Sequence, residues 1–381
     1  MTTPHPILNR RTFLITSLVA ATETPRAILH PAHAATQPRS ITRDPLPMSP
    51  SIDEADRLLA TQAAAGTLAA ATFLVRHGTR EFARAYGQAR LATPFLIASP
   101  TKPMTAAAVL LLRDRHQLQL HDPVAKFLPQ FAGADRAAVT IKQLLTHTSG
   151  LPDMLPENTD LRKRHAPLAD FVAGTCRTPL LFPPGTKVSY QSMGILLAAA
   201  IVEKITGQSL PQFLADHLFH PLQMNATSLG LGGRPIADTA RCQVSGASDW
   251  DWNSPYWRNL GAPWGGAHST VHDLATFIEH FTSTAPGPLA IETRREARSI
   301  QTPSLNQSWG LGWSLQPGAF GKTCSPATFG HFGSTGTVVW HDPAATLTCV
   351  LLTTKPASDS RTGLLGPVSD LVARHAQPPE K

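Results

Sequence analysis

The chain has 381 residues, 42% of them hydrophobic, and a formal net charge of +7. This length and apolar content suffice for a substantial core and fit a globular protein of one large domain or two. The charge is diffuse, and no basic run with interleaved aromatic residues occurs, so the composition argues against a nucleic-acid-binding protein.

The first 34 residues predict an export signal. Residues 9–14 read Asn-Arg-Arg-Thr-Phe-Leu, and the apolar run that follows ends near Ala21. That run is shorter than the roughly 20 apolar residues of a membrane span, and residues 32–34 (Ala-His-Ala) offer a small-residue cleavage site. The segment resembles a twin-arginine signal, although Asn9 and Ile15 replace the residues usual at their positions. We therefore expect an exported protein, periplasmic or secreted, with no membrane span in its mature form.

The folded domain is expected to start near residue 51, after a polar, proline-rich linker over residues 35–50. Ser51 and Glu54 have the spacing of a capping box, which predicts a helix towards residue 65. Two short runs bounded by a glycine-containing turn then predict a β-hairpin, with strands over 70–76 and 81–86.

Ser99 and Lys102 stand at the head of an alanine-rich helical segment. At a rise of about 1.5 Å per residue they lie one turn apart on one helix face. A serine hydroxyl becomes a good nucleophile when a neighbour removes its proton and a positive dipole lies near the site of attack. Pro100 fits the first helical position, where its missing N–H costs nothing. The pattern predicts a nucleophile with its base; the alternative is a capped helix with an exposed lysine.

Helical and proline-rich segments follow and predict a mostly α insertion over about residues 122–229. Within it, Tyr190-Gln191-Ser192 directly precedes an apolar helix over residues 193–206. Thr270 has the sequence context of a helix cap, which predicts a further helix to about residue 281.

The C-terminal region predicts strands and a closing helix, and residues 331–336 (His-Phe-Gly-Ser-Thr-Gly) open its last part. We expect these strands and the N-terminal hairpin to form one antiparallel sheet flanked by helices and split by the α insertion. The fold class is therefore α+β, with one domain over 51–375 and a tail over 376–381. The expected strands span 312–316, 335–340 and 346–353, and the expected helix spans 364–375.

Three elements match, in order, the layout of serine β-lactamases and penicillin-binding-protein-like enzymes: Ser-x-x-Lys at 99–102, Tyr-x-Ser at 190–192 and the motif at 331–336. From about Ser51 to about Ala373 the chain resembles the class C β-lactamase-related serine hydrolases, which include esterases and D-amino-acid peptidases. The resemblance implies a β-lactamase/transpeptidase-like fold and a hydrolase without a cofactor. Further matching stretches are 118–123 (Leu-Gln-Leu-His-Asp-Pro), 140–150 (Thr-Ile-Lys-Gln-Leu-Leu-Thr-His-Thr-Ser-Gly), 182–186 (Phe-Pro-Pro-Gly-Thr) and 309–313 (Trp-Gly-Leu-Gly-Trp).

The resemblance also implies a role for each motif. Ser99 would form the acyl-enzyme, and Lys102 would hold its ammonium, or its neutral amine, against the hydroxyl. Tyr190 would relay a proton from Ser99 to the leaving group, as base and then acid, which requires a nearby cation because the ordinary phenol pKa is about 10. The backbone N–H groups of Ser99 and Ser334 would form the oxyanion hole. The implied substrate-binding residues are Ser192, His331, Phe332 and Gly333.

Departures from the β-lactamase pattern bear on the substrate. His331 and Phe332 replace the Lys and Thr of the Lys-Thr-Gly element, so a cation and a hydroxyl become a mostly neutral imidazole and a phenyl. A penicillin carboxylate would lose two anchors. We therefore expect a carboxylesterase acting on small esters. The alternatives are a β-lactamase or D-amino-acid peptidase with the same residues, and a non-catalytic relative that binds cell-wall peptides or polymer.

The other motifs add little chemistry. The four cysteines form no Cys-x-x-Cys pair, so no metal site is expected, and no Gly-x-Ser-x-Gly elbow of an α/β-hydrolase occurs. His147 and His268 are expected to be structural hydrogen-bonders. Four tryptophans within residues 250–264 could wall an apolar acyl pocket or pack under a loop. The expected partner is a small-molecule ester or amide, and the oligomeric state is left open.

Overall fold

The computed structural model describes residues 43–133 and 135–376. The predicted export signal, the first half of the predicted linker and all but the first residue of the predicted tail lie outside the described residues. In the part described, no single helix has the length and hydropathy of a membrane span, although Met193–Thr206 and Leu210–Phe219 would pass that test together, as a pair bent by 81°.

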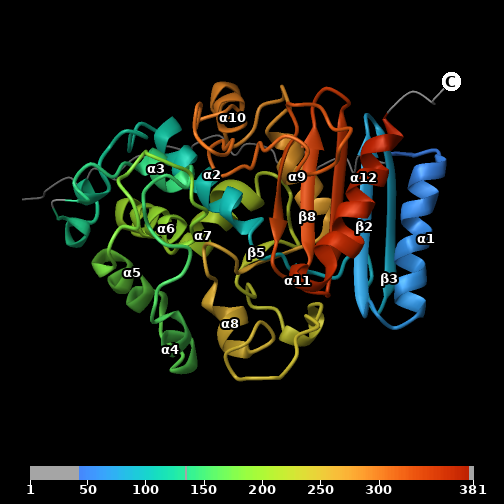
Figure 1. Ribbon diagram of the computed structural model, residues 1–381, viewed down its shortest axis with the longest axis horizontal. Coiled ribbons are helices and arrows are strands. Elements are labelled where there is room, and N and C mark those ends of the chain that lie inside the picture. The colour runs from blue at the N-terminus through green and yellow to red at the C-terminus, as the bar shows by residue number, and fades with distance from the viewer. Residues whose placement is uncertain (1–42, 134, 377–381) are drawn as a thin grey trace, which may run out of the picture. The chain divides into compact units, whose positions relative to one another are not determined.

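A six-stranded sheet with the order β1-β3-β2-β9-β8-β7 forms the framework (Figure 1). The N-terminal strand β2 pairs antiparallel with β9, with Phe73 opposite Leu351. This pairing confirms that the N-terminal hairpin and the C-terminal strands form one sheet. The strands are β1 (Asp44–Pro45), β2 (Ala70–His77), β3 (Arg80–Gly87), β7 (Phe329–Gly333), β8 (Thr337–Asp342) and β9 (Leu347–Thr353).

The two faces of the sheet belong to two separate cores. Because successive strand residues point to opposite faces, Phe73 and Val75 pack with α1 (Pro50–Ala64) and α12 (Gly366–His375), while Leu74 packs with α9 (Val271–His280). Figure 1 shows α12 in front of the strands and α9 behind them. Both sides of the sheet are therefore covered, and the chain between β3 and β7 extends the core that contains α9.

That long connection is mostly helical and includes a small second sheet, in the order β4-β6-β5. Helix α6 is the predicted apolar helix, with the predicted bounds, and α9 has the predicted cap, Thr270. The α-helices here are α2 (Thr101–Asp114), α3 (Ile141–Leu145), α4 (Asn158–Lys163), α5 (Leu168–Arg177), α6 (Met193–Thr206), α7 (Leu210–Leu214), α8 (Pro255–Leu260) and α10 (Ile291–Ala297), and the short strands are β4 (Phe95–Leu96), β5 (Ser228–Leu229) and β6 (Ala267–Ser269). Short α11 (Ala357–Ser360) precedes α12.

The structure corrects several boundaries. Helix α1 is capped by Ser49, not Ser51, because Pro50 occupies the first turn and the Ser49 hydroxyl accepts from the N–H of Ile52. The predicted linker ends early, since β1 pairs with β3 and Leu46 is buried. Residues 312–316 form no strand; Gly312 has φ +86° and only Ser314 makes bridges. The sheet is interrupted over 88–328, well beyond the α insertion expected at 122–229.

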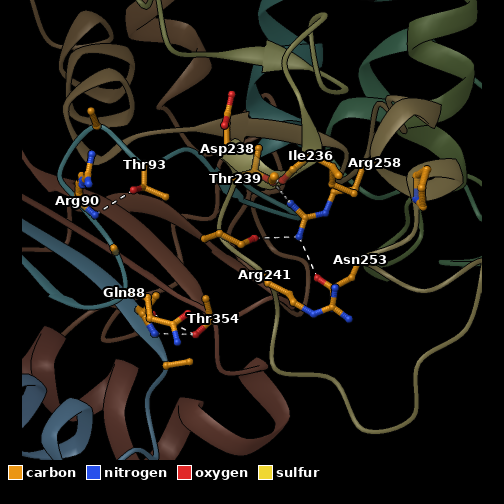
Figure 2. A pocket seen from close by; sticks show the side chains of 17 residues that line it. Gln88, Arg90, Thr93, Ile236, Asp238, Thr239, Arg241, Asn253, Arg258 and Thr354 are labelled. Carbon is orange, nitrogen blue, oxygen red and sulfur yellow. Dashed lines mark hydrogen bonds between the residues drawn. The ribbon is translucent and has the colours of Figure 1, made fainter.

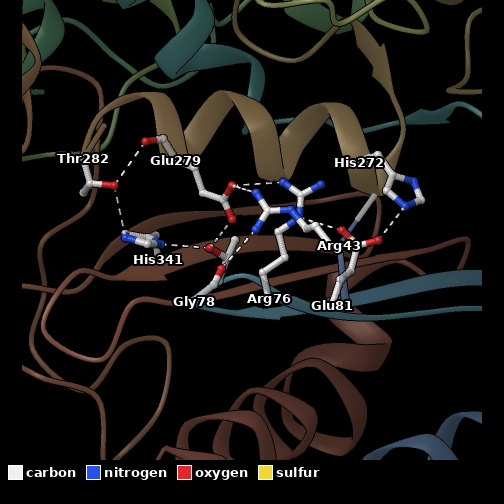
Figure 3. A network of polar contacts seen from close by, with 9 residues as sticks. Arg43, Arg76, Gly78, Glu81, His272, Glu279, Thr282 and His341 are labelled. Carbon is white, nitrogen blue, oxygen red and sulfur yellow. Dashed lines mark hydrogen bonds and ion pairs between the residues drawn. The ribbon is translucent and has the colours of Figure 1, made fainter. Parts of the chain in front are cut away.

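A polar network fastens α9 to the sheet (Figure 3). Glu279 of α9 accepts hydrogen bonds from Arg76 of β2 at 3.0 Å and from Arg43 at 3.1 Å. Arg76 also donates to Glu81 of β3 at 2.7 Å, and a ring nitrogen of His272, in the first turn of α9, lies 3.2 Å from the same carboxylate. The helix is thus bound to two neighbouring strands by charged groups as well as by apolar packing.

This network predicts acid sensitivity. Burial alone would raise the pKa of Glu81, but the hydrogen bonds and charges of His272 and Arg76 outweigh it and lower this pKa from 4.5 to about 2. A lowered carboxyl pKa stabilises the fold above pH 4.5, and that contribution is lost as the pH falls towards 2. We expect Glu81→Gln to reduce the free energy of unfolding by on the order of 2 kcal/mol at pH 7 and by much less near pH 2.

Chemical denaturation at the two pH values measures both differences. Glu54→Gln, at an exposed position of α1, is the matched control and should change neither value. An equal loss of stability at both pH values would contradict the assignment of this pH dependence to Glu81.

Candidate active site

Ser99 lies at the turn between β4 and α2. The residue before it, Ala98, has φ +54°, in the left-handed region that costs a non-glycine residue about 1 kcal/mol or more. The Ala98 carbonyl accepts hydrogen bonds from the N–H of Thr101 at 2.9 Å and from its hydroxyl at 2.6 Å, which stabilise the turn. Pro100 precedes the first helical residue, one position earlier than predicted. The turn leaves the Ser99 side chain partly exposed at the N-terminal end of α2.

Lys102 reaches Ser99 as the helical spacing predicts. Its Nζ lies 3.2 Å from the Ser99 Oγ and donates to the backbone carbonyl of Trp264 at 2.9 Å. Lys102 is buried, with 1% of its surface exposed. Burial lowers the pKa of Lys102 from 10.5 to about 7, against the opposing effect of the Asp153 carboxylate. A large fraction of the amine is therefore neutral near pH 7 and able to accept a proton.

Tyr190 lies beside the same amine, with the Lys102 Nζ 4.7 Å from the centre of its ring. Burial raises the pKa of the phenol well above 10, and the nearby Ser99 hydroxyl offsets only part of the shift. The nearby Lys102 does not offset this rise in the phenol pKa, because Lys102 is itself buried and readily loses its proton. At neutral pH the Tyr190 phenol thus keeps its proton, and the Lys102 amine is the group that loses one more readily.

His147 holds Tyr190 in place. Its carbonyl accepts from the N–H of Ser189 at 2.9 Å, and its Nδ1 accepts from the N–H of Gln191 at 3.2 Å, so both neighbours of Tyr190 are bound to it. The imidazole also lies 4.7 Å from the Tyr190 ring and 4.3 Å from that of Trp309. The prediction of a structural hydrogen-bonder is confirmed for His147.

A close approach of two backbone segments brings Ser334 towards Ser99. A Cβ on Gly333 would lie 2.2 Å from the carbonyl oxygen of Ile97, so only glycine permits this packing. The hydroxyls of Thr335 and Thr337 donate to the Leu96 and Ile97 carbonyls, each at 2.6 Å. Gly333 therefore serves the packing of β7 against the Ser99 turn, which is a different role from the substrate contact expected for it.

The two predicted oxyanion donors are free. Within the residues described, the backbone N–H groups of Ser99 and Ser334 make no hydrogen bond. Two unused N–H groups beside a nucleophile are what stabilisation of a developing oxyanion requires.

Ser192 is buried, and its hydroxyl donates to the Asp153 carboxylate at 2.6 Å. The Ser192 hydroxyl, which was expected to bind substrate, is thus already hydrogen-bonded to another side chain of this chain. Sequence reasoning missed Asp153, whose charge acts on both Lys102 and Tyr190. Its position just after the 140–150 stretch was the signal available for it.

His331 and Phe332 point to opposite faces of β7, because side chains alternate along a strand. The His331 ring lies 6.0 Å from that of Tyr190, on the site's side of the sheet. Phe332 instead stacks on Phe320 at 5.2 Å and packs into the core with α1 and α12, beneath the Arg361 guanidinium. The expectation that Phe332 contacts substrate is therefore wrong.

A cavity of about 920 Å³ lies elsewhere, and Ser99 does not line it. Figure 2 shows the side chains of Arg90, Arg241 and Arg258 around it. Arg258 is buried and donates to neutral acceptors, among them Asn253 and the Ala240 carbonyl. In the described part of the chain, no group of three His, Cys, Asp or Glu side chains could hold a metal ion.

The sequence of residues 55–372 matches the family model described as Beta-lactamase. The chain belongs to the beta-lactamase family. The fold described above is the β-lactamase/transpeptidase-like fold, as the sequence resemblance implies.

Relatives of this beta-lactamase family member carry several descriptions. A putative D-alanyl-D-alanine carboxypeptidase of Escherichia coli K12 is 24% identical, with 92% of each chain aligned. Protein flp of Staphylococcus aureus MW2 is 31% identical over 42% of this chain, and the match spans only 34% of that protein. A solved family VIII carboxylesterase superimposes with a TM-score of 0.69 at 19% identity, covering 86% of this chain and 98% of its own. This likeness shows the shared fold.

Proposed function

We propose that this protein is a serine hydrolase that acts through a Ser99 acyl-enzyme, with small carboxylic esters as its substrates. The observation that carries the proposal is the buried Lys102 amine, 3.2 Å from the Ser99 Oγ and with a pKa of about 7. A neutral amine at hydrogen-bond distance is a competent general base for a serine hydroxyl.

In the proposed acylation step, Lys102 takes the proton of the Ser99 hydroxyl as Oγ attacks the ester carbonyl carbon. The N–H groups of Ser99 and Ser334 stabilise the oxyanion. When the carbonyl re-forms, the C–O bond to the leaving alkoxide breaks, Tyr190 donates its proton to that alkoxide, and the Lys102 ammonium returns a proton to Tyr190. Water then attacks the acyl-enzyme by the same groups in reverse, which releases the acid and restores Ser99.

Esters are favoured over β-lactams by the lack of a cation at position 331. Burial and the nearby Lys102 lower the pKa of His331 to about 3, so its ring is neutral and cannot pair with the carboxylate of a penicillin. The Asp153 carboxylate near Lys102 and Tyr190 would repel such an anion. A small neutral ester needs neither contact.

The test is a direct comparison of substrates. We expect kcat/KM for p-nitrophenyl butyrate to exceed that for nitrocefin after each is divided by its hydroxide-catalysed rate. His331→Lys should narrow the gap by roughly one to two decades, because a hydrogen bond to a charged group contributes about 1.5 to 3 kcal/mol. The matched control is Phe332→Thr, which faces the other side of β7 and should leave the ratio unchanged. Efficient nitrocefin hydrolysis with negligible ester turnover would overturn the proposal.

The pH dependence provides a second test. Since only neutral Lys102 accepts the Ser99 proton, kcat/KM should rise with pH through about 7 and fall about tenfold per pH unit below it. Asp153→Asn should move the midpoint to lower pH, because the Asp153 charge favours the ammonium form of Lys102. Steady-state rates from pH 5 to 9 measure both. A flat profile across this range would contradict the role given to Lys102.

A D-amino-acid peptidase remains the second candidate, supported by the end-to-end match to the E. coli protein described as a putative D-alanyl-D-alanine carboxypeptidase. Release of D-alanine from a D-alanyl-D-alanine peptide at a rate above that of ester hydrolysis would favour it.

The third alternative is a non-catalytic relative that binds cell-wall peptides or polymer. Such a protein would fail to react with a fluorophosphonate probe.

A further inference from the structure

Asp153 is an exposed residue whose carboxylate is fixed beside the catalytic groups. Its Oδ1 accepts a hydrogen bond from the buried Ser192 hydroxyl at 2.6 Å, and its backbone carbonyl accepts from the Ser192 N–H at 3.2 Å. Ser192 lies two residues after Tyr190 and directly precedes α6. Two hydrogen bonds from one residue therefore hold Asp153 in a defined position next to the segment that carries Tyr190.

The carboxylate lies on the Tyr190 side of the nucleophile. Its charge acts on both Lys102 and Tyr190. The Lys102 Nζ, in turn, lies 3.2 Å from the Ser99 Oγ and 4.7 Å from the centre of the Tyr190 ring. Ser99 is partly exposed and Asp153 is exposed, so a ligand can approach both from solvent. A substituent of an ester bound at Ser99 can therefore come close to this carboxylate.

Among the described residues, no cation is paired with Asp153, and its Oδ2 accepts no hydrogen bond. Lys102 is buried and partly neutral near pH 7, and the lowered pKa values of His147 and His331 keep both rings neutral. Arg361 packs on the opposite face of β7. The exposed side of the site is therefore negative, with one carboxylate oxygen unused.

We propose that Asp153 is a specificity-determining residue that binds an ammonium group of the substrate. The inference rests on the proposed ester hydrolysis at Ser99 and specifies its substrate class as amino-substituted esters. An ammonium donates charge-assisted hydrogen bonds, and a carboxylate oxygen is the matching acceptor. An ester that carries a carboxylate would be repelled by the same charge. Ser192 acts as a positioning residue, because its hydroxyl holds the other carboxylate oxygen.

The kinetic test compares the ethyl esters of 2-amino-, 3-amino- and 4-aminobutyrate with ethyl butyrate at pH 7, each rate divided by that of hydroxide. At least one amino ester should have a kcat/KM about fivefold or more above that of ethyl butyrate, which is the upper range for an exposed ion pair. Monoethyl succinate, which carries a carboxylate, should be a poorer substrate than ethyl butyrate. The advantage of the amino ester should fall with added salt, because exposed charges are screened.

Variants of Asp153 test whether this charge causes the preference. Asp153→Asn keeps an acceptor for Ser192 but removes the charge, so the preference should fall to about twofold or less. A change in the Lys102 pKa affects both substrates alike and cancels in this ratio. Asp153→Glu should retain part of the preference, and Asp153→Lys should reverse it in favour of monoethyl succinate. Asp160→Asn, at an exposed carboxylate of α4, is the matched control and should leave the preference intact.

A binding measurement separates this inference from the proposed function. Ser99→Ala protein should bind the preferred amino ester about fivefold or more tightly than ethyl butyrate in a ligand-observed NMR titration, and adding Asp153→Asn should remove the difference. Ester hydrolysis without a preference for an amino ester in either experiment would overturn the role of Asp153 alone. The binding preference without any ester hydrolysis would overturn the esterase and retain the ammonium site.

Discussion

Ser99→Ala is expected to reduce kcat/KM for p-nitrophenyl butyrate by about 10⁴-fold or more while the protein stays folded, because it removes the atom that forms the acyl bond. Lys102→Ala should cost nearly as much, since it removes the amine that lies 3.2 Å from the Ser99 hydroxyl and is held there by the Trp264 carbonyl. Tyr190→Phe should cost about 10² to 10⁴, the usual contribution of a positioned acid.

The combination of these changes is the sharper test. Groups that act as one unit contribute non-additively, so Ser99→Ala with Lys102→Ala should be little worse than Ser99→Ala alone. Lys163→Ala, an exposed lysine of α4, is the matched control and should retain full activity. Stoichiometric fluorophosphonate labelling should disappear in Ser99→Ala. Persistent labelling of that variant, or near-normal turnover by folded Lys102→Ala, would refute the assigned roles.

Gly333→Ala should lower kcat by at least 10²-fold, although Gly333 has no side chain that could take part in the chemistry. The new Cβ would lie 2.2 Å from the Ile97 carbonyl oxygen and 3.0 Å from Pro100 Cδ, so β7 must move away from the Ser99 turn. That movement carries the Ser334 N–H out of place, and the loss of one oxyanion donor costs about 10²- to 10³-fold.

The control for this substitution is Gly363→Ala. A Cβ there meets nothing within 4 Å, and the residue has no left-handed φ, so activity and melting temperature should stay close to wild type. Circular dichroism and thermal denaturation separate a displaced oxyanion hole from general unfolding. A folded Gly333→Ala protein with wild-type kcat would show that the close approach of β7 is not required.

Several features of the site were predictable because they are local. Ser99 and Lys102 meet across one helical turn, and a helix has the same geometry wherever it occurs. The apolar helix after Tyr190 and the capped helix at Thr270 were also predicted, because their side-chain pattern repeats with the helical period.

Other predictions failed where a local pattern had two structural solutions. Apolar residues alternate with small or polar ones around Gly312, as they would in a strand. A Cβ at this glycine would clash with the Ala106 side chain of α2, and the segment packs against α2 as a loop instead. Position 332 was given a substrate contact because it corresponds to the Thr of the Lys-Thr-Gly element. The pleat of β7 turns Phe332 into the opposite core, and only the placement of the sheet shows which face is which.

The sequence by itself determined that Ser99 and Lys102 meet across one helical turn, where the apolar helix after Tyr190 lies, and which two ends of the chain form the divided sheet. Tertiary structure alone decided the chemistry of these groups. The Trp264 carbonyl comes from 162 residues away to hold Lys102, and burial by distant elements lowers the lysine pKa to about 7 while raising that of Tyr190. The pKa of a side chain and the pairing of its polar atoms depend on what surrounds it in space, and a linear pattern does not specify those surroundings.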